Sequence, residues 1–289
     1  MGKNTAIEWC NRILPDGTII LGHSFNVWWG CVRVARECDG CYADDLATRY
    51  GMNLWGPFAE RRFFGEKHWN EPYIWDKEAE RLGHRANVFC SSMADVFEVY
   101  TIRRNQGTEI QKRDERIAAQ MEADRKRLWK RIEQTRNLNW ILLTKRPGNV
   151  EKLVPWGNDW PDNVWLGTSA GTQERADKWL PILLKIPAQV HLVSVEPQLE
   201  HVDLSPYLPR LDWVIQGGES GPHHRPFKAE WARSLRDQCM SARLQGYPVA
   251  YYFKQWGGRL HNSGGRMLDG RTHDDMPPEY PVQRKEVYV

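Results

Sequence analysis

The chain has 289 residues, and its 40 Lys or Arg against 37 Asp or Glu give a formal net charge of +3 at pH 7. This length can bury a large core, so a small scaffold held together by disulfides is excluded, and the mild charge permits a nucleic-acid partner without requiring one. The amino terminus lacks the apolar segment of a secretory signal, and no apolar run approaches the roughly 18 residues of a membrane span. We therefore expect a protein of the reducing cytoplasm, where clustered thiols are more often metal ligands or catalysts than disulfides.

Short apolar runs alternate with helix-like segments along the chain. Each run begins with β-branched, aromatic or leucyl residues, as is typical of strands buried on both faces. The runs lie at 24–30, 88–97, 140–147, 164–171, 190–197, 212–221 and 249–258. Strands that alternate with helices form βαβ units and a parallel sheet. We predict an α/β fold, a partial or full (β/α) barrel of about six βα units in a single domain over residues 1–289.

Two segments interrupt this alternation and are predicted to be helical insertions. The first, at about 51–86, is rich in aromatic and charged residues, and the second lies at about 100–137. Within the second, residues 103–136 read as a long helix with eleven Lys or Arg and six Asp or Glu. These charges indicate either a solvated face or a basic arm that contacts phosphate. The tail, 259–289, has Gly, Pro and Asp clusters and is expected to be irregular.

Half of the six cysteines lie in the single segment "GCVRVARECDGCYA", directly after the first predicted strand. They are Cys31, Cys38 and Cys41. Three thiolates at this spacing suit zinc, with Cys10 or His23 as a fourth ligand. They also suit an iron–sulfur cluster that leaves one iron open. The spacing alone does not distinguish these metals.

Polar residues follow the apolar runs, at the points where the predicted strands end. In a (β/α) barrel the active site forms at the carboxyl ends of the strands, so these residues are the candidate site. They are Cys31, Ser91–Asp95, Thr144–Arg146, Thr168–Ser169, Ser194–Glu196, Gly217–Ser220 and Lys254–Gln255. His223 and His224 follow in a loop and are expected to face solvent, whereas Cys239 on an apolar helix face is expected in the core.

The cysteine segment resembles that of radical S-adenosylmethionine enzymes, in which three cysteines follow the first strand and the last two form C-x-x-C. The end "CDGCYA" resembles the C-x-x-C-Tyr of spore photoproduct lyases, although six residues separate Cys31 from Cys38 where the usual motif has three. From about residue 5 to 258 the chain is also similar to a phage- and prophage-borne family related to these enzymes. The shared motifs are "FNVWWGC", "CDGCYA", "SMADVF", "LTKRP", "WLGTS", "SVEP", "GGESG" and "FKQWG".

This resemblance implies a [4Fe–4S] cluster on the three clustered cysteines, with S-adenosylmethionine at the open iron. Lys145 is then the expected partner of the cofactor carboxylate, and Arg146 of the cofactor or a substrate phosphate. Glu196 would hold a ribose or the substrate, or form an ion pair with Lys145. Cys90, inside a strand, is expected to be a buried thiol, with donation of a hydrogen atom as the alternative.

The remaining candidates are small or polar residues for which the resemblance implies cofactor binding. Ser91 and Ser92 suit the methionine moiety, with Asp95 orienting them. Thr168 and Ser169 suit the ribose, and Gly217 and Gly218 allow a close backbone approach. These residues are Ser91, Ser92, Asp95, Thr168, Ser169, Gly217, Gly218 and Glu219. For Glu219 an ion pair with Arg225 is the alternative.

We interpret the sequence as that of an iron–sulfur enzyme that reductively cleaves S-adenosylmethionine to a 5′-deoxyadenosyl radical and modifies or repairs a substrate. The implied partners are an electron donor and, as the first choice of substrate, DNA, RNA or a nucleotide, with no membrane. For a nucleic acid, basic contacts at Arg125, Lys126 and Lys130 and stacking on Trp69, Tyr73 or Trp75 are expected. The alternatives are a zinc-stabilised nucleic-acid-binding protein without radical chemistry and a barrel that uses its cluster for structure or sensing.

Overall fold

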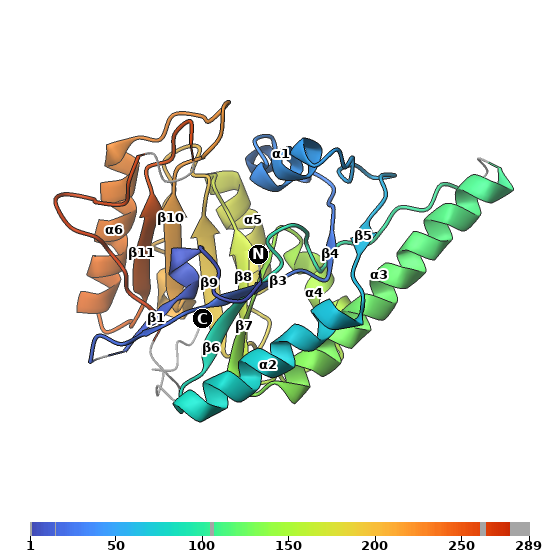
Figure 1. Cartoon of the computed structure of the whole chain (residues 1–289). Helices are drawn as coiled ribbons and strands as arrows, with labels where there is room; N and C mark the ends of the chain where they lie inside the picture. The colour runs from blue at the N-terminus through green and yellow to red at the C-terminus, as the bar shows by residue number, and fades with distance from the viewer. Residues whose placement is uncertain (1, 15, 105–106, 261–263, 278–289) are drawn as a thin grey trace. The chain divides into compact units, whose positions relative to one another are not determined.

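The computed structural model describes residues 2–14, 16–104, 107–260 and 264–277. The chain divides into two compact units, Met1–Val164 and Trp165–Val289 (Figure 1). Parallel strands alternate with helices in both units, and strands that follow one another within the sheet are neighbours in space. This is the strand order of (β/α) barrels. The predicted α/β class with the parallel sheet of a partial barrel is confirmed.

In the first unit the sheet strands are β3 (His23–Phe25), β6 (Ala86–Cys90) and β7 (Leu138–Thr144), paired in parallel in that order. Helix α2 (Glu66–Leu82) packs against β6 and β7. Helix α3 (Thr108–Gln134) runs beside α2 in both views. An ion pair between Arg127 and Glu66 joins the two helices at 2.6 Å. Both insertions thus contain helices, as expected.

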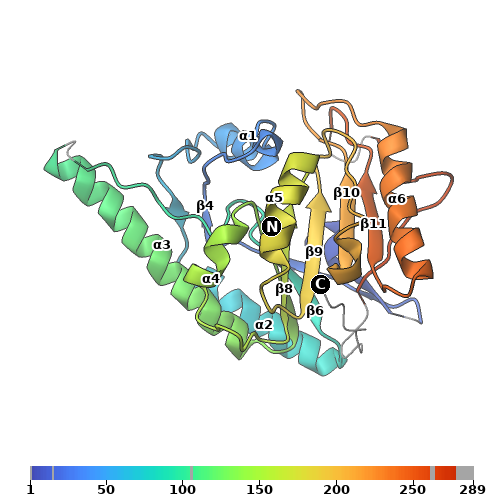
Figure 2. The same cartoon turned by 180° about the vertical axis from the view of Figure 1, so that it is seen from behind.

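The second unit takes in β8 (Val164–Ser169), from its second residue, β9 (Val190–Val195), β10 (Trp213–Gly217) and β11 (Ala250–Gln255). These strands pair in parallel in chain order. Helix α5 (Gln173–Leu183) follows β8, and α6 (Ala229–Leu244) lies along β10 and β11 (Figure 2). Cys239 on α6 is fully buried, whereas His223 and His224 are exposed, as predicted.

The first predicted strand, 24–30, is wrong in its extent. Strand β3 ends at Phe25, and the backbone oxygen of the next residue, Asn26, contacts His68 Nε2 at 2.8 Å instead of a neighbouring strand. The apolar run continues as a separate strand, β4 (Trp28–Trp29), which pairs antiparallel with β5 (Arg62–Phe63). The chain also has a short hairpin of β1 (Arg12–Ile13) and β2 (Ile19–Ile20) that the sequence did not suggest.

The remaining elements are short and lie at strand or helix ends. They are α1 (Tyr42–Arg49), α4 (Val150–Leu153) and the 3-10 helices η1 (Glu8–Cys10), η2 (Arg36–Cys38), η3 (Pro147–Asn149) and η4 (Leu208–Arg210). Within the predicted tail, Leu268 forms an isolated bridge with Arg271, and residues 278–289 lie outside the described part of the chain.

Helix α3 confirms the predicted long charged helix but not the basic contacts proposed on it. Arg125 is 6% exposed and donates to the carbonyl oxygens of Val96 and Glu98 at 2.6 and 2.5 Å. It therefore holds the segment after β6 in place and is not available to a phosphate. Lys130 and Lys126 are exposed, and Lys126 pairs with Glu122 at 2.6 Å.

The aromatic residues expected to stack on bases also serve the core. Trp69 and Trp75 are 0% and 2% exposed, so the stacking prediction is wrong for both. Tyr73 lies under the guanidinium of Arg131, 3.5 Å from its ring centroid, and its hydroxyl donates to Gln134. These side chains pack α2 against its neighbours, because an amphipathic helix needs a bulky inner face.

Candidate functional site

The first arm of the cysteine segment, Gly30 and Cys31, is fixed by backbone hydrogen bonds on both sides. Gly30 N donates to Met93 O, and Gly56 N donates to Cys31 O, each at 3.0 Å. Gly30 has a φ of 113°, and a Cβ there would lie 2.6 Å from Leu54 O. Only glycine meets both conditions. The residue before Cys31 thus sets the direction in which the chain leaves β4.

The second arm, which carries Cys38 and Cys41, is fixed at the start of α1. Cys38 is the last residue of η2, and Cys41 directly precedes α1. The hydroxyl of Tyr42 donates to Ser92 O at 2.7 Å. Cys41 packs against an apolar cluster that includes Trp29 and Met93. Both arms are therefore attached to the segment that follows β6.

The three clustered thiols differ from the other three in exposure. All six cysteines are free, but Cys31, Cys38 and Cys41 are partly exposed, whereas Cys10, Cys90 and Cys239 are buried. Burial raises the pKa of the Cys41 thiol, and the Lys145 ammonium opposes this. Burial and Glu98 raise the pKa of the Cys31 thiol, which the Arg146 guanidinium opposes. Two cations from the end of β7 thus lie where they favour thiolates.

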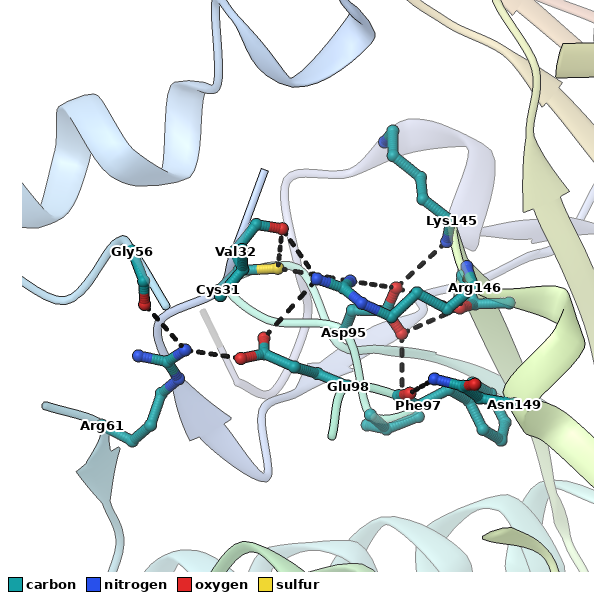
Figure 3. Close-up of polar contacts among 12 residues, drawn as sticks. Cys31, Val32, Gly56, Arg61, Asp95, Phe97, Glu98, Lys145, Arg146 and Asn149 are labelled. Atoms are coloured by element: carbon teal, nitrogen blue, oxygen red, sulfur yellow. Dashed lines mark hydrogen bonds and ion pairs between the residues drawn. The ribbon is translucent and has the colours of Figure 1, made fainter. Parts of the chain in front are cut away.

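Asp95 fixes the end of β7. Its carboxylate accepts hydrogen bonds from Thr144 Oγ1 at 2.9 Å, from Lys145 N at 3.0 Å and from Arg146 Nη1 at 2.8 Å (Figure 3). The carboxylate was expected to orient Ser91 and Ser92, yet these contacts are with the last residue of β7 and the two residues after it. Asp95 therefore holds the backbone from which the two candidate cations extend.

Sequence reasoning missed two residues of this network, Glu98 and Arg61. Their ion pair is 2.5 Å long and fully buried, with side-chain exposures of 2% and 0%. Arg61 also donates to the carbonyl oxygens of Leu54 and Gly56, which flank the cysteine segment in space (Figure 3). Arg61 lies in a segment that sequence patterning assigned to a charged insertion, and charge alone gave no sign that it is buried.

Cys90, Ser91 and Ser92 lie at the end of β6 and are 0%, 5% and 8% exposed. The thiol of Cys90 contacts Ser91 Oγ at 3.3 Å, and burial raises its pKa to about 12. Ser92 Oγ accepts a hydrogen bond from the side-chain amide of Asn26 at 3.1 Å. The buried thiol matches the expectation for Cys90, and Ser92 joins the ends of β3 and β6.

In the second unit, the strand ends carry their own polar network. Glu196 accepts hydrogen bonds from Lys254 Nζ at 2.6 Å and from Gln255 Nε2 at 3.1 Å. Glu219 is 6% exposed and pairs with Arg225 at 2.6 Å. Both carboxylates therefore already have a cationic partner within this unit.

The candidate residues at the ends of β8 and β10 are buried by the sheet itself. Thr168 and Ser169 are 0% and 2% exposed. A Cβ on Gly218 would lie 2.1 Å from Trp256 O, and one on Gly217 would lie 3.4 Å from both Gln255 O and Glu196 Oε1. The close approach of neighbouring backbone accounts for Gly218, as expected for a glycine beside another strand.

The donor set of the cysteine segment fits an iron–sulfur cluster by its chemistry. In the part of the chain that the structure covers, no three His, Cys, Asp or Glu side chains are already arranged around a metal position. Cys31 instead contacts Arg146. The three thiols on this segment are free and partly exposed, and they match in number and type the ligands of an iron–sulfur cluster with one open iron.

The candidate fourth ligands for zinc are engaged elsewhere. The thiol of Cys10 donates to the carbonyl oxygens of His23 and Asn87, and it is fully buried. The imidazole of His23 accepts from Asn4 N at 3.1 Å through Nδ1 and stacks on Trp75. Cys10 and His23 therefore already have partners of their own within the described structure.

A cavity of about 610 Å³ adjoins the cysteine segment in the first unit, lined by Trp29, Leu46, Tyr50, Met52 and Arg62. The Arg62 guanidinium lies 4.6 Å from the Trp29 ring centroid. Leu46 and Met52 pack against the same apolar cluster as Cys41. The cavity lining and Cys41 thus share one apolar cluster, which sequence patterning did not suggest.

No helix in the described ranges is both long and apolar enough to cross a membrane. None of the curated proteins matches the chain. Among solved structures, it is similar to a mutant spore photoproduct lyase with bound AdoMet and dinucleoside spore photoproduct. The two share 12% identity with a TM-score of 0.45, over 79% of this chain and 75% of the other. A family described as "Protein of unknown function (DUF5131)" matches residues 4–277, and the chain therefore belongs to that family.

Proposed function

We propose that this protein is an iron–sulfur enzyme of the radical S-adenosylmethionine type that acts in the reducing cytoplasm. The observation that carries the proposal is the set of three free, partly exposed thiols on a segment whose two arms are both fixed at the end of β6. Cys31, Cys38 and Cys41 would hold a [4Fe–4S] cluster. When bound and reduced by an electron donor, this cluster supplies the electron that cleaves S-adenosylmethionine to a 5′-deoxyadenosyl radical.

Lys145 is our candidate for binding the carboxylate of S-adenosylmethionine. Its backbone is fixed by Asp95, while its side chain extends away from the Asp95–Arg146 pair (Figure 3). Its ammonium favours the thiolate of Cys41, so the charge lies beside a cluster ligand. A cation held there can pair with a carboxylate bound at the open iron. In the second unit, Glu196 is our candidate acceptor for a ligand hydroxyl.

We assign a nucleic acid or nucleotide as the substrate class on the chemistry of the cavity beside the cysteine segment. Tyr50 is 66% exposed and offers an aromatic face, and Trp29 forms another wall. Arg62 stacks on Trp29 and Phe64. Flat rings stack on aromatic side chains and on guanidinium groups, and a phosphate pairs with the same guanidinium. A nucleotide presents both groups.

Anaerobic reconstitution with iron and sulfide tests the cofactor. We expect about four irons per chain and 5′-deoxyadenosine after S-adenosylmethionine and a reductant are added. Serine at Cys31, Cys38 or Cys41 should remove most of the iron, whereas the matched control Cys239→Ala, in the core, should retain it. A colourless protein with one zinc would support the zinc-binding alternative. A brown protein that never releases 5′-deoxyadenosine would support a structural or sensing cluster.

Polarisation of a labelled single-stranded oligonucleotide tests the substrate class without any cluster. Tyr50→Ala should weaken binding by about 1–3 kcal/mol if a base stacks there. Arg62→Gln should weaken binding and reduce the salt slope by about one. Arg49→Gln, another exposed arginine of the same region, is the control. Competition with a mononucleotide separates a free nucleotide from a strand, and equal binding by all variants would refute the assignment.

A further inference from the structure

Arg146 joins the first cysteine to the end of β7. Its Nη2 donates to Val32 O at 2.7 Å, and its Nη1 lies 3.7 Å from Cys31 Sγ (Figure 3). The same Nη1 pairs with Asp95 at 2.8 Å, and Nη2 lies 3.9 Å from Glu98. The side chain is only 12% exposed.

These contacts engage both terminal nitrogens of the guanidinium, Nη1 and Nη2. A guanidinium has five N–H donors in a rigid fork, so it can contact a carboxylate, a carbonyl oxygen and a sulfur together. A lysine has three N–H donors on a single nitrogen, whereas Arg146 uses two separate nitrogens for these contacts. The geometry of Arg146 therefore serves the protein's own first cysteine, whereas the sequence suggested cofactor or substrate phosphate.

We infer that Arg146 is the positioning residue of the first cysteine: it anchors the Cys31 arm to β7 and donates to the Cys31 sulfur. The role in tuning a cluster rests on the proposed function, but the anchoring of Cys31 does not.

The surrounding charges keep this guanidinium in place. Asp95 and Glu98 bear two negative charges, and Arg61 and Arg146 bear two positive charges. An arginine side chain stays protonated in proteins, and both carboxylates attract it. Arg61 pairs with Glu98 from the far side, so Glu98 links two arginines that flank the cysteine segment. Arg146 thus remains charged and oriented towards the sulfur.

The first test uses the cluster-free protein. Native protein is exposed briefly to hydroxyl radicals, which oxidise thiol and thiolate alike, and the oxidation of each cysteine is quantified by peptide mapping. In Arg146→Gln and Arg146→Lys, Cys31 should react about tenfold faster, because charged hydrogen bonds of about 1.5 kcal/mol no longer hold its arm. Cys38 and Cys41 should change less than twofold, since Tyr42 holds their arm independently. Arg136→Gln, which removes an exposed ion pair with Asp162, is the control.

The lysine variant separates positioning from charge, and it remains usable if the glutamine variant does not fold. Full restoration of wild-type Cys31 reactivity by lysine would show that charge alone suffices and would overturn the inference. So would an unchanged Cys31 rate in both variants, or an equal increase at all three cysteines.

The second test measures the reduction potential of the reconstituted cluster. A donor at a ligand sulfur stabilises the reduced, more negative cluster, so both variants should have a more negative potential than wild type and Arg136→Gln. An unchanged potential would overturn the tuning role. If the wild type takes up no iron, the proposed function fails, while the labelling pattern still decides whether Arg146 anchors Cys31.

Discussion

Replacement of Gly30 by alanine should destabilise the first unit and displace the first cysteine. Gly30 has a φ of 113°, and its Cβ would lie 2.6 Å from Leu54 O and 2.8 Å from Arg61 Cδ. The backbone contact cannot be relieved by a side-chain rotation, so β4 or the segment around Leu54 must move.

The expected loss of stability in Gly30→Ala has two parts, and the same substitution at a second glycine, Gly51, separates them. Gly51 also has a positive φ, 72°, but nothing lies within 4 Å of its Cβ position. Gly51→Ala therefore reports backbone strain alone, about 1–2 kcal/mol. Gly30→Ala adds overpacking of about 1–3 kcal/mol, which gives a total of about 2–5 kcal/mol.

Urea unfolding of the cluster-free proteins, followed by circular dichroism, measures both free energies of unfolding. Iron content after reconstitution then reports whether Cys31 still reaches its position, and Gly30→Ala should bind less iron than Gly51→Ala. If Gly30→Ala is no less stable than Gly51→Ala, the steric argument for how the chain leaves β4 is wrong.

Three further predictions concern side chains whose environment the sequence did not reveal. Burial lowers the pKa of His23 to about 4, so the unfolded chain binds a proton between pH 6.5 and 4 that the folded protein does not, and stability should fall as pH falls through this window. His23→Phe keeps a ring against Trp75 but cannot take up a proton, so it should gain stability relative to wild type on acidification, by about 1.4 kcal/mol per pKa unit. Urea titrations at acid and neutral pH measure this gain. A difference in unfolding free energy that stays the same at both pH values would count against the prediction. Arg125→Met should lower the free energy of unfolding by about 1–3 kcal/mol, because two buried carbonyl oxygens lose their donor. The control Lys126→Met, at an exposed position, should have almost no effect in the same titration. Equal effects of the two substitutions would contradict the burial argument. Rapid alkylation of native protein should modify the partly exposed Cys31, Cys38 and Cys41 before the buried Cys10, Cys90 and Cys239. Mass spectrometry would reveal any early modification of the buried three, which would contradict the prediction.

The strand runs were predictable because residues buried on both faces of a sheet are apolar without interruption. The segments 140–147 and 190–197 correspond to β7 and β9 within a few residues. Strands β4 and β5 have two residues each, too few to show any periodicity. The pairing of Trp28 and Trp29 with residues more than 30 positions away depends on tertiary contacts that no local pattern contains.

The candidate site was predictable where the residue type itself restricts the chemistry. The clustered cysteines stood out because thiols are rare in this chain, and Lys145 and Arg146 because they follow a strand. Charged residues whose partners are distant in sequence could not be assigned. Arg125 and Lys126 are neighbours of the same class, yet one is buried against the carbonyl oxygens of Val96 and Glu98 and the other is exposed.

Because the two arms of the cysteine segment are attached separately, the number of residues between them can change at little cost in stability. Gly30 and Tyr42 are each bonded to the segment after β6, and Val32 is bonded to Arg146, so residues 33–40 only need to bridge two fixed points. Loop-closure entropy grows with the logarithm of length, so widening the gap from three residues to six costs only about 0.6 kcal/mol. Insertions between Cys31 and Cys38 should therefore be tolerated in this fold far better than any change at Gly30 or Tyr42.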